Sequence, residues 1–170
     1  MSGGPGRVQA YIGLGANLGD LVDTLRAALA ALAALPASRL DAVSGAYRSA
    51  PVEAGGPDYL NAVARLDTAL APEALLDALQ AIEQAHGRQR PYPNAPRTLD
   101  LDLLLHGNLQ LNSPRLQLPH PRLQRRAFVL RPLLELAPAL AVPGLGALSA
   151  YLPSVADQRV ERLSLSLYPN

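Results

Sequence analysis

Four segments of the chain carry the hydrophobic pattern of β-strands. Residues 8–14 and 42–48 are short and rich in aliphatic and aromatic side chains. At 59–67 alanine or leucine occupies every second position, so that one face of a strand would carry Leu60, Ala62, Ala64 and Leu66. At 99–105 leucines alternate with two aspartates, which predicts a strand with leucines 99, 101, 103 and 105 on one face.

Two further segments repeat leucine every three or four residues, as amphipathic helices do. The first, 20–35, ends at Pro36, and the second is bracketed by Pro72 at its start and Gly87 past its end. The elements therefore follow one another as strand, helix, strand, strand, helix, strand. This is the split βαβ order, and we expect an α+β fold, a ferredoxin-like βαββαβ sandwich with an antiparallel sheet and additional C-terminal elements.

The remaining segments are irregular or weakly patterned. Glycines and prolines predict loops at 50–58 and 87–98, and loops near the second length are usually lids or binding loops. Near the C-terminus the pattern predicts a helix at 126–137 interrupted by Pro132 and an edge strand at 163–167.

Length and composition fit a single domain. With 170 residues, 49% of them hydrophobic, the chain can fill one core, and we assign residues 7–170 to one domain that follows a flexible tail at 1–6. No apolar run is long enough to cross a membrane, and the first residues do not resemble a signal peptide. We therefore expect a cytoplasmic protein that binds no membrane, and we also expect it to be a monomer.

Two residue types are missing from the chain, which excludes several chemistries. The absence of cysteine excludes thiol nucleophiles, disulfides and cysteine zinc sites. All fifteen basic residues are arginines, which excludes a lysine Schiff base and a P-loop. Eight of these arginines lie within 87–131 beside only two acids, whereas 1–86 has five arginines and nine acids. The concentration predicts a local anion site, because guanidinium donates paired hydrogen bonds to phosphate.

Asp100 and Asp102 are the two acids of this basic region. On the predicted strand both point to one face, with α-carbons about 6.6 Å apart. Carboxylates so placed can share two divalent cations roughly 3.5 to 4 Å apart, and Mg²⁺ suits a site that also receives phosphate. The alternative is a half-solvated strand whose outward positions are acidic. The surrounding arginines favour the metal site.

Three arginines, Arg88, Arg90 and Arg97, lie in the predicted loop at 87–98. They fit a charged surface loop, but three like charges within ten residues repel one another unless an anion lies among them. Arginines on a loop can also stabilise the charge that develops on a transferring phosphoryl group. We therefore interpret the loop as part of a phosphate site.

Polar residues elsewhere are weaker candidates. Gln80 and Glu83 are neighbours on one helix face, where solvent exposure is the simpler interpretation. His120 lies between two prolines, and it would either present its imidazole to phosphate or lie solvated in a loop.

An aromatic and amide group is the candidate for binding a flat heterocycle. Tyr59 and Asn61 share one face of the strand at 59–67, and Phe128 is the only phenylalanine of the chain. Two aromatic rings would clamp the heterocycle while the amide reads its edge. Ordinary cross-strand packing is the alternative.

Two other functions fit parts of the sequence. Gly13, Gly15 and Gly19 follow a strand and precede a helix, as in nicotinamide-binding domains, but their spacing is one residue too long and a turn is the favoured interpretation. A non-catalytic RNA-binding sandwich would use the arginines, although 4% aromatic residues leave few platforms for stacked bases. We expect no nucleic-acid partner.

Five motifs follow one another along the chain: Tyr47–Pro51, Pro57–Asn61, Gly87–Arg90, Ala95–Asp102 and Leu118–His120. Together they resemble the 6-hydroxymethyl-7,8-dihydropterin pyrophosphokinases of the folate pathway, over a region from about Tyr11 to Ala137. The resemblance implies a ferredoxin-like fold and transfer of pyrophosphate from ATP to the pterin hydroxymethyl group, leaving AMP.

The same resemblance implies roles for individual residues. Asp100 and Asp102 would hold two Mg²⁺ ions and, with Arg88 and Arg97, form the catalytic group. The ATP-binding residues would be Gln80, Arg88, Arg90, Arg97, Leu103, Arg115, His120 and Arg126. The pterin would lie among Ser49, Ala50, Val52, Tyr59, Asn61 and Phe128. Glu83 would face the cleft between the two substrates.

Overall fold

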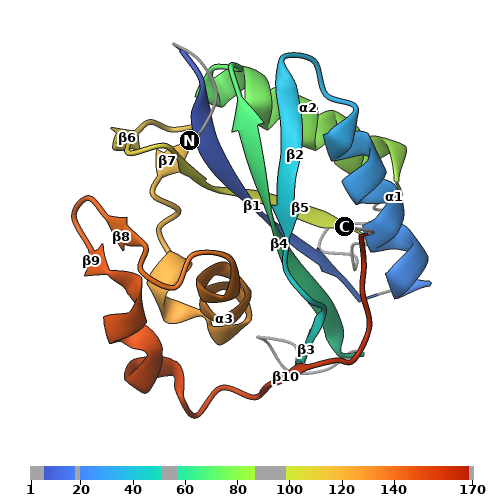
Figure 1. Ribbon diagram of the computed structural model, residues 1–170, viewed down its shortest axis with the longest axis vertical. Helices are drawn as coiled ribbons and strands as arrows, with labels where there is room; N and C mark the ends of the chain where they lie inside the picture. Colours follow the sequence, from blue (N-terminus) through green and yellow to red (C-terminus); the bar gives the residue numbers. More distant parts are fainter. Residues whose placement is uncertain (1–5, 18–19, 51–56, 87–98, 169–170) are drawn as a thin grey trace.

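A six-stranded antiparallel sheet forms the centre of the computed structural model, which describes residues 6–17, 20–50, 57–86 and 99–168 (Figure 1). The strand order is β10-β3-β4-β1-β5, and β2 also pairs with β4. The strands are β1 (Val8–Ala16), β2 (Ser38–Val43), β3 (Tyr47–Ser49), β4 (Tyr59–Thr68), β5 (Asp100–His106) and β10 (Val160–Arg162). The strands predicted at 8–14, 59–67 and 99–105 are therefore confirmed.

The strand predicted at 42–48 is interrupted. Its place on the edge of β4 is shared by β2 and β3, which are separated by residues 44–46. There Ser44 N still donates to Val63 O at 2.9 Å, but the return bond goes to a side chain, because Val63 N donates to Ser44 Oγ at 2.9 Å. Gly45 N then donates to Glu135 Oε2 at 2.9 Å, away from β4. With β2 and β3 counted as one edge position, the order of the sheet is the expected ferredoxin-like one.

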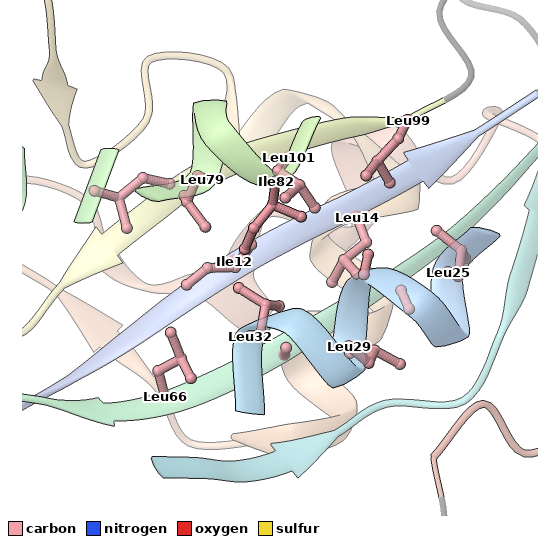
Figure 2. Close-up of a cluster of buried hydrophobic side chains, with 14 of the residues drawn as sticks. Ile12, Leu14, Leu25, Leu29, Leu32, Leu66, Leu79, Ile82, Leu99 and Leu101 are labelled. Atoms are coloured by element: carbon pink, nitrogen blue, oxygen red, sulfur yellow. The ribbon is translucent and has the colours of Figure 1, made fainter. Parts of the chain in front are cut away.

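Helices α1 (Leu21–Ala33) and α2 (Pro72–Ala85) cover one face of the sheet through an all-apolar cluster. Asp20 caps α1 by accepting a hydrogen bond from Asp23 N at 3.2 Å, which satisfies one of the free amides of the first turn. Figure 2 shows leucines of α1 facing residues of β1 and β4 in this cluster, among them Leu25, Leu29, Leu32, Leu14 and Leu66.

The opposite face is covered by α3 (Ala127–Leu136) and by the 3₁₀ turns η1 (Leu123–Arg125) and η2 (Leu148–Val155), across the sheet from α1 and α2 (Figure 1). The predicted helix is confirmed as α3, but the expected interruption is wrong, because the helix continues through Pro132. This second apolar cluster explains why Val63, on the other face of β4 from Leu66, is also buried. Two short hairpins lie outside the main sheet: β6 (Leu111–Asn112) with β7 (Gln117–Leu118), and β8 (Ala141–Val142) with β9 (Gly146–Ala147).

The single leucine face predicted for 99–105 is wrong at its last residue. The register of β5 against β1 shifts at Tyr11 and Ile12, which oppose Leu105 and Leu103. Leu104 is therefore an extra residue in β5, and a bulge of this kind reverses the facing of the residues after it. Leu105 consequently packs in the second cluster, whereas both aspartates precede the bulge and keep their shared face.

The edge strand predicted at 163–167 is also wrong. The strand that pairs with β3 is β10, immediately before this segment, and Leu163 N still donates to Ala46 O at 2.8 Å. Leu165 then packs against the first apolar cluster and Leu167 is buried within it. The alternation of leucine and serine therefore reflects one-sided packing without a hydrogen-bonded ladder.

Candidate active site

The two aspartates open onto a face of the sheet that lacks side chains beside them. Both are half-buried at the start of β5, and on β1 they oppose Gly15 and Gly13. A Cβ at Gly15 would lie 3.4 Å from Asn61 Oδ1, so the glycine keeps open the space between Asp100 and that amide. Both the turn and the dinucleotide interpretation are wrong for these two glycines, because they lie inside a strand; Gly19 is outside the described residues.

One cavity has a volume of about 270 Å³, and we call it the nucleotide-side cavity after the ligand that the sequence resemblance assigns to several of its residues. Four predicted site residues line it: Asp102, Leu103, Arg115 and His120. Gln80 lies at its edge, because Arg115 Nη2 approaches Gln80 Oε1 at 3.4 Å while also pairing with Asp77. The fold thus gathers residues from α2, β5, the turn between β6 and β7, and the segment after β7.

Electrostatics tie Arg126 to both aspartates. Burial and the neighbouring Arg122 lower the pKa of Arg126, while the charges of Asp102 and Asp100 act in the opposite direction. A guanidinium remains charged even when its pKa is lowered. Arg126 is therefore a fixed positive charge within electrostatic range of the acidic pair.

His120 is held as a neutral imidazole. Burial, followed by the charges of Arg126 and Arg122, lowers its pKa to about 4. Arg122 N donates to His120 Nδ1 at 3.1 Å, so the ring proton is assigned to Nε2. His120 can therefore donate one hydrogen bond into the nucleotide-side cavity without carrying charge.

A second cavity has a volume of about 510 Å³, and we call it the pterin-side cavity after the ligand that the sequence resemblance assigns to several of its residues. Its walls include Ser49, Ala50, Arg126 and Phe128, and the Arg126 guanidinium lies over the Phe128 ring at 5.5 Å. Arg126 thus borders this cavity and also acts on the acidic pair of β5.

Asn61 is buried between Gly15 of β1 and the strand β3. Its Nδ2 donates to Ser49 Oγ at 2.7 Å and to Tyr47 O at 3.3 Å. The ring of Tyr59 is close by, since its Cδ2 would lie 3.8 Å from a Cβ on Gly15. The predicted pair on β4 therefore lies beside the open face.

Glu83 is buried rather than solvent-exposed. It is 3% exposed, and its Oε2 accepts a hydrogen bond from Leu101 N at 2.8 Å. Leu101 separates the two aspartates along β5, so this contact supports the strand at the point where the acidic side chains leave it. An unpaired buried main-chain donor there would cost about 1 to 3 kcal/mol.

Some predicted residues lie outside the described part of the chain, and others were missed. Arg88, Arg90, Arg97 and Val52 belong to the first group. The pterin-side cavity is also lined by residues that sequence reasoning left unassigned: Arg122, Arg125, Gln158, Arg159 and Val160. There was an indication in the sequence only for the first two residues, which belong to the arginine-rich region 87–131. Nothing in the sequence pattern indicated the three C-terminal residues.

Asp102 lines one cavity, and Arg126, which acts electrostatically on both aspartates, borders the other. This arrangement fits the class of enzymes that move a phosphate-bearing group between two bound molecules. Residues 11–138 match the family model of 7,8-dihydro-6-hydroxymethylpterin-pyrophosphokinase. The chain is 49% identical over 156 residues to the 2-amino-4-hydroxy-6-hydroxymethyldihydropteridine pyrophosphokinase of Pseudomonas aeruginosa, covering 91% of this chain and 96% of that one. It is 41% identical to the Haemophilus influenzae enzyme of the same name, covering 92% and 99%.

The chain therefore belongs to the 7,8-dihydro-6-hydroxymethylpterin-pyrophosphokinase family. Its reaction is the ATP-dependent transfer of pyrophosphate to the hydroxyl of 6-hydroxymethyl-7,8-dihydropterin, a step of folate biosynthesis. The expected family and activity are confirmed.

Solved structures support the fold independently of sequence. A Plasmodium falciparum HPPK-DHPS structure matches with a TM-score of 0.69 at 13% identity, and an HPPK-DHPS in complex with substrates matches with 0.70. Each match covers 87% of this chain, which spans less than half of those longer chains, 45% and 43%. These matches confirm the ferredoxin-like α+β fold. Within the described ranges, no helix is both long and apolar enough to span a bilayer.

Proposed function

We propose that Asp100 and Asp102 hold the Mg²⁺ ions that accompany ATP, two in number, between the two cavities. The donor set fits a hard cation, because two half-buried carboxylates leave one strand on the same open face. The described residues contain no group of three or more acidic, histidine or cysteine ligands, so phosphate and water would complete the coordination, as Mg²⁺ prefers. Bound there, the ions would neutralise phosphate charge.

ATP would lie in the nucleotide-side cavity. Arg115 and the Nε2–H of His120 would donate to the phosphates, and Gln80 would lie beside Arg115. Leu103 would supply an apolar wall. The loop arginines Arg88, Arg90 and Arg97 complete the proposal from the sequence, with Arg88 and Arg97 stabilising the bridging oxygen that leaves with AMP.

The pterin would lie in the pterin-side cavity between aromatic walls. Phe128 would cover one side of the ring, and Ser49 and Ala50 would line its edge. Tyr59 as the second aromatic wall and Val52 at the edge complete the proposal from the sequence. Since the Asn61 amide already donates to β3, its Oδ1 is the atom that remains to accept a pterin N–H. Held in this way, the substrate hydroxyl would attack the β-phosphorus of ATP in line with the leaving oxygen.

The observation that carries this proposal is the position of Arg126. It borders the pterin-side cavity, stacks over Phe128 and acts electrostatically on both aspartates. Arg126 would therefore stabilise the charge of the group as it passes between the substrates.

The test measures AMP formation from ATP and 6-hydroxymethyl-7,8-dihydropterin as Mg²⁺ is added to metal-free enzyme. We expect AMP as product, a dependence on Mg²⁺, and a fall in kcat for Arg126→Gln of about 10²-fold or more. The matched control is Arg39→Gln, because Arg39 is an exposed arginine of β2 with a 68% exposed side chain. Formation of ADP, full activity without divalent cations, or equal kcat in both variants would refute the proposal.

We also propose that the enzyme works as a cytoplasmic monomer whose single domain spans residues 7–170. Residues of one chain supply the described walls of both cavities, from Ser49 to Val160. Analytical ultracentrifugation at assay concentrations tests the monomer, and a dimeric active species would contradict it. Removal of residues 1–6 should leave kcat and KM unchanged.

A further inference from the structure

Three segments that are distant in the sequence meet at the carboxylate of Glu135 on α3. Its Oε1 accepts hydrogen bonds from Tyr47 Oη at 2.6 Å and from Arg162 Nε at 3.2 Å, and its Oε2 accepts one from Gly45 N at 2.9 Å. Gly45 allows this approach, because a Cβ there would lie 2.7 Å from Arg162 Nη2. The carboxylate thus ties α3 to the turn before β3 and to β10.

This network continues into the wall of the pterin side. Asn61 Nδ2 donates hydrogen bonds to two acceptors on β3: the main-chain oxygen of Tyr47 and, two residues further along, the Oγ of Ser49. The amide is therefore oriented with Nδ2 toward β3 and Oδ1 toward the open face at Gly15. Any shift of β3 would move both acceptors that set this orientation.

The same network sets the position of α3. Phe128 precedes Glu135 by seven residues, which is about two helical turns, so both side chains leave the same side of the helix. Arg131, one turn between them, lies over the Tyr47 ring at 5.7 Å and donates from Nη1 to Val160 O at 2.7 Å. Helix α3 is therefore attached to β3 and β10 at two positions about one helical turn apart, Arg131 and Glu135.

We propose that Glu135 is a positioning residue for the pterin: it holds α3 against β3 so that Phe128 and Asn61 keep the separation that a bound pterin ring requires. Glu135 lines neither described cavity, and it acts through those two residues. The inference rests on the proposed placement of the pterin.

The ionisation of the network is constant under assay conditions. Burial, followed by the hydrogen bond and charge of Glu135, raises the pKa of Tyr47 to about 12. Burial acts to raise the pKa of Glu135, but the hydrogen bonds from Arg162, Tyr47 and Gly45 outweigh it, and the pKa is lowered. Glu135 is thus an anion and Tyr47 a neutral phenol from about pH 6 to 9. In this pH range, kinetic effects of variants of the network therefore reflect the positions of its residues and not a change in their protonation.

The experiment compares steady-state kinetics of Glu135→Ala, Glu135→Gln and Tyr47→Phe with those of the wild type. We expect Glu135→Ala to raise the KM for the pterin by about tenfold or more while the KM for ATP stays within about twofold. Glu135→Gln should be intermediate, because an amide oxygen can still accept from Tyr47 or Gly45. The control is Glu161→Gln on β10, an exposed acid paired with Arg48, which should match the wild type.

Several results would overturn the inference. If Glu135→Gln and Tyr47→Phe lower Tm but leave the KM for the pterin unchanged, the carboxylate is only structural, and the same two variants decide the matter if Glu135→Ala does not fold. Parallel rises in both KM values would also overturn it. Phe128→Ala separates this failure from failure of the pterin placement, because an unchanged KM for the pterin in Phe128→Ala refutes the placement itself.

Discussion

The two faces of the sheet differ in what they leave unfilled. The face under α1 and α2 is closed by an apolar cluster in which leucines meet leucines (Figure 2). The face under α3 has an apolar cluster too, but beside it lie Gly13, Gly15, Asp100 and Asp102, whose short or polar side chains leave it open. The first face therefore supplies stability, and the second carries the surface at which we propose that the substrates bind.

Replacement of Asp102 by asparagine should produce the largest effect on activity. Asp102 lies on the open face. Asp102→Asn removes a proposed metal ligand and a charge that acts on Arg126, so we expect kcat to fall by about 10³-fold or more with Tm little changed. AMP release and thermal unfolding measure the two quantities. Glu73→Gln, which neutralises an exposed acid at the start of α2, is the matched control. A near-normal kcat in Asp102→Asn would defeat the assignment.

Truncation of Leu29 should show the opposite profile on the closed face. Leu29 of α1 is fully buried, and Leu29→Ala should lower the free energy of unfolding by about 2 to 5 kcal/mol through the cavity it leaves. Denaturant unfolding measures this loss. Both KM values should remain those of the wild type at a temperature where the variant is folded. A specific rise in either KM would show that the two faces are not functionally separate.

A methyl group on the open face should produce a smaller effect that depends on where it is added. Gly15→Ala places a Cβ 3.4 Å from Asn61 Oδ1, the atom proposed to accept a pterin N–H, so we expect the KM for the pterin to rise by about tenfold as the methyl group covers that acceptor. Gly13→Ala is its control, because there the nearest atom is a Leu104 methyl at 3.5 Å, an ordinary contact. Equal KM values in the two variants would mean that the face at Gly15 does not receive the pterin.

The smallest expected effect is a pH dependence that comes from His120. Its pKa is about 4 in the folded protein and about 6.5 in the unfolded chain. The unfolded state therefore binds more protons between these values, and stability should decrease as pH falls from about 6.5 to 4. His120→Gln should flatten the dependence of Tm on pH in this window. An unchanged slope in His120→Gln would place the ring in solvent.

Much of the candidate site could be predicted from local patterns in the sequence. Asp100 and Asp102 share a face because strands alternate, and this held because the bulge at Leu104 comes later. The motifs around Tyr59 and Asn61 likewise lie on one strand, so a short-range rule placed them together. Residues near one another on one element are the part of a site that periodicity can locate.

The contribution of the C-terminal segment could not be read in this way. Gln158 and Val160 line the pterin-side cavity, and Gln158 bonds Arg125 O and Ala127 N at the start of α3, each at 2.8 Å. No pattern around Gln158 indicates that it packs against a turn more than thirty residues earlier. The break between β2 and β3 was missed for the same reason, since the partner of Gly45 is Glu135.

The sequence by itself determined the order of strands and helices, the apolar face of each, the acidic pair and the family, because these depend on periodicity and on short motifs. Only the tertiary structure decided that the second face of the sheet is also covered, that Leu105 turns to that face, and that Glu135 joins α3 to β3 and β10. These features arise from contacts between segments far apart along the chain. Such contacts depend on the three-dimensional packing of whole elements, which leaves no local trace in the order of residues.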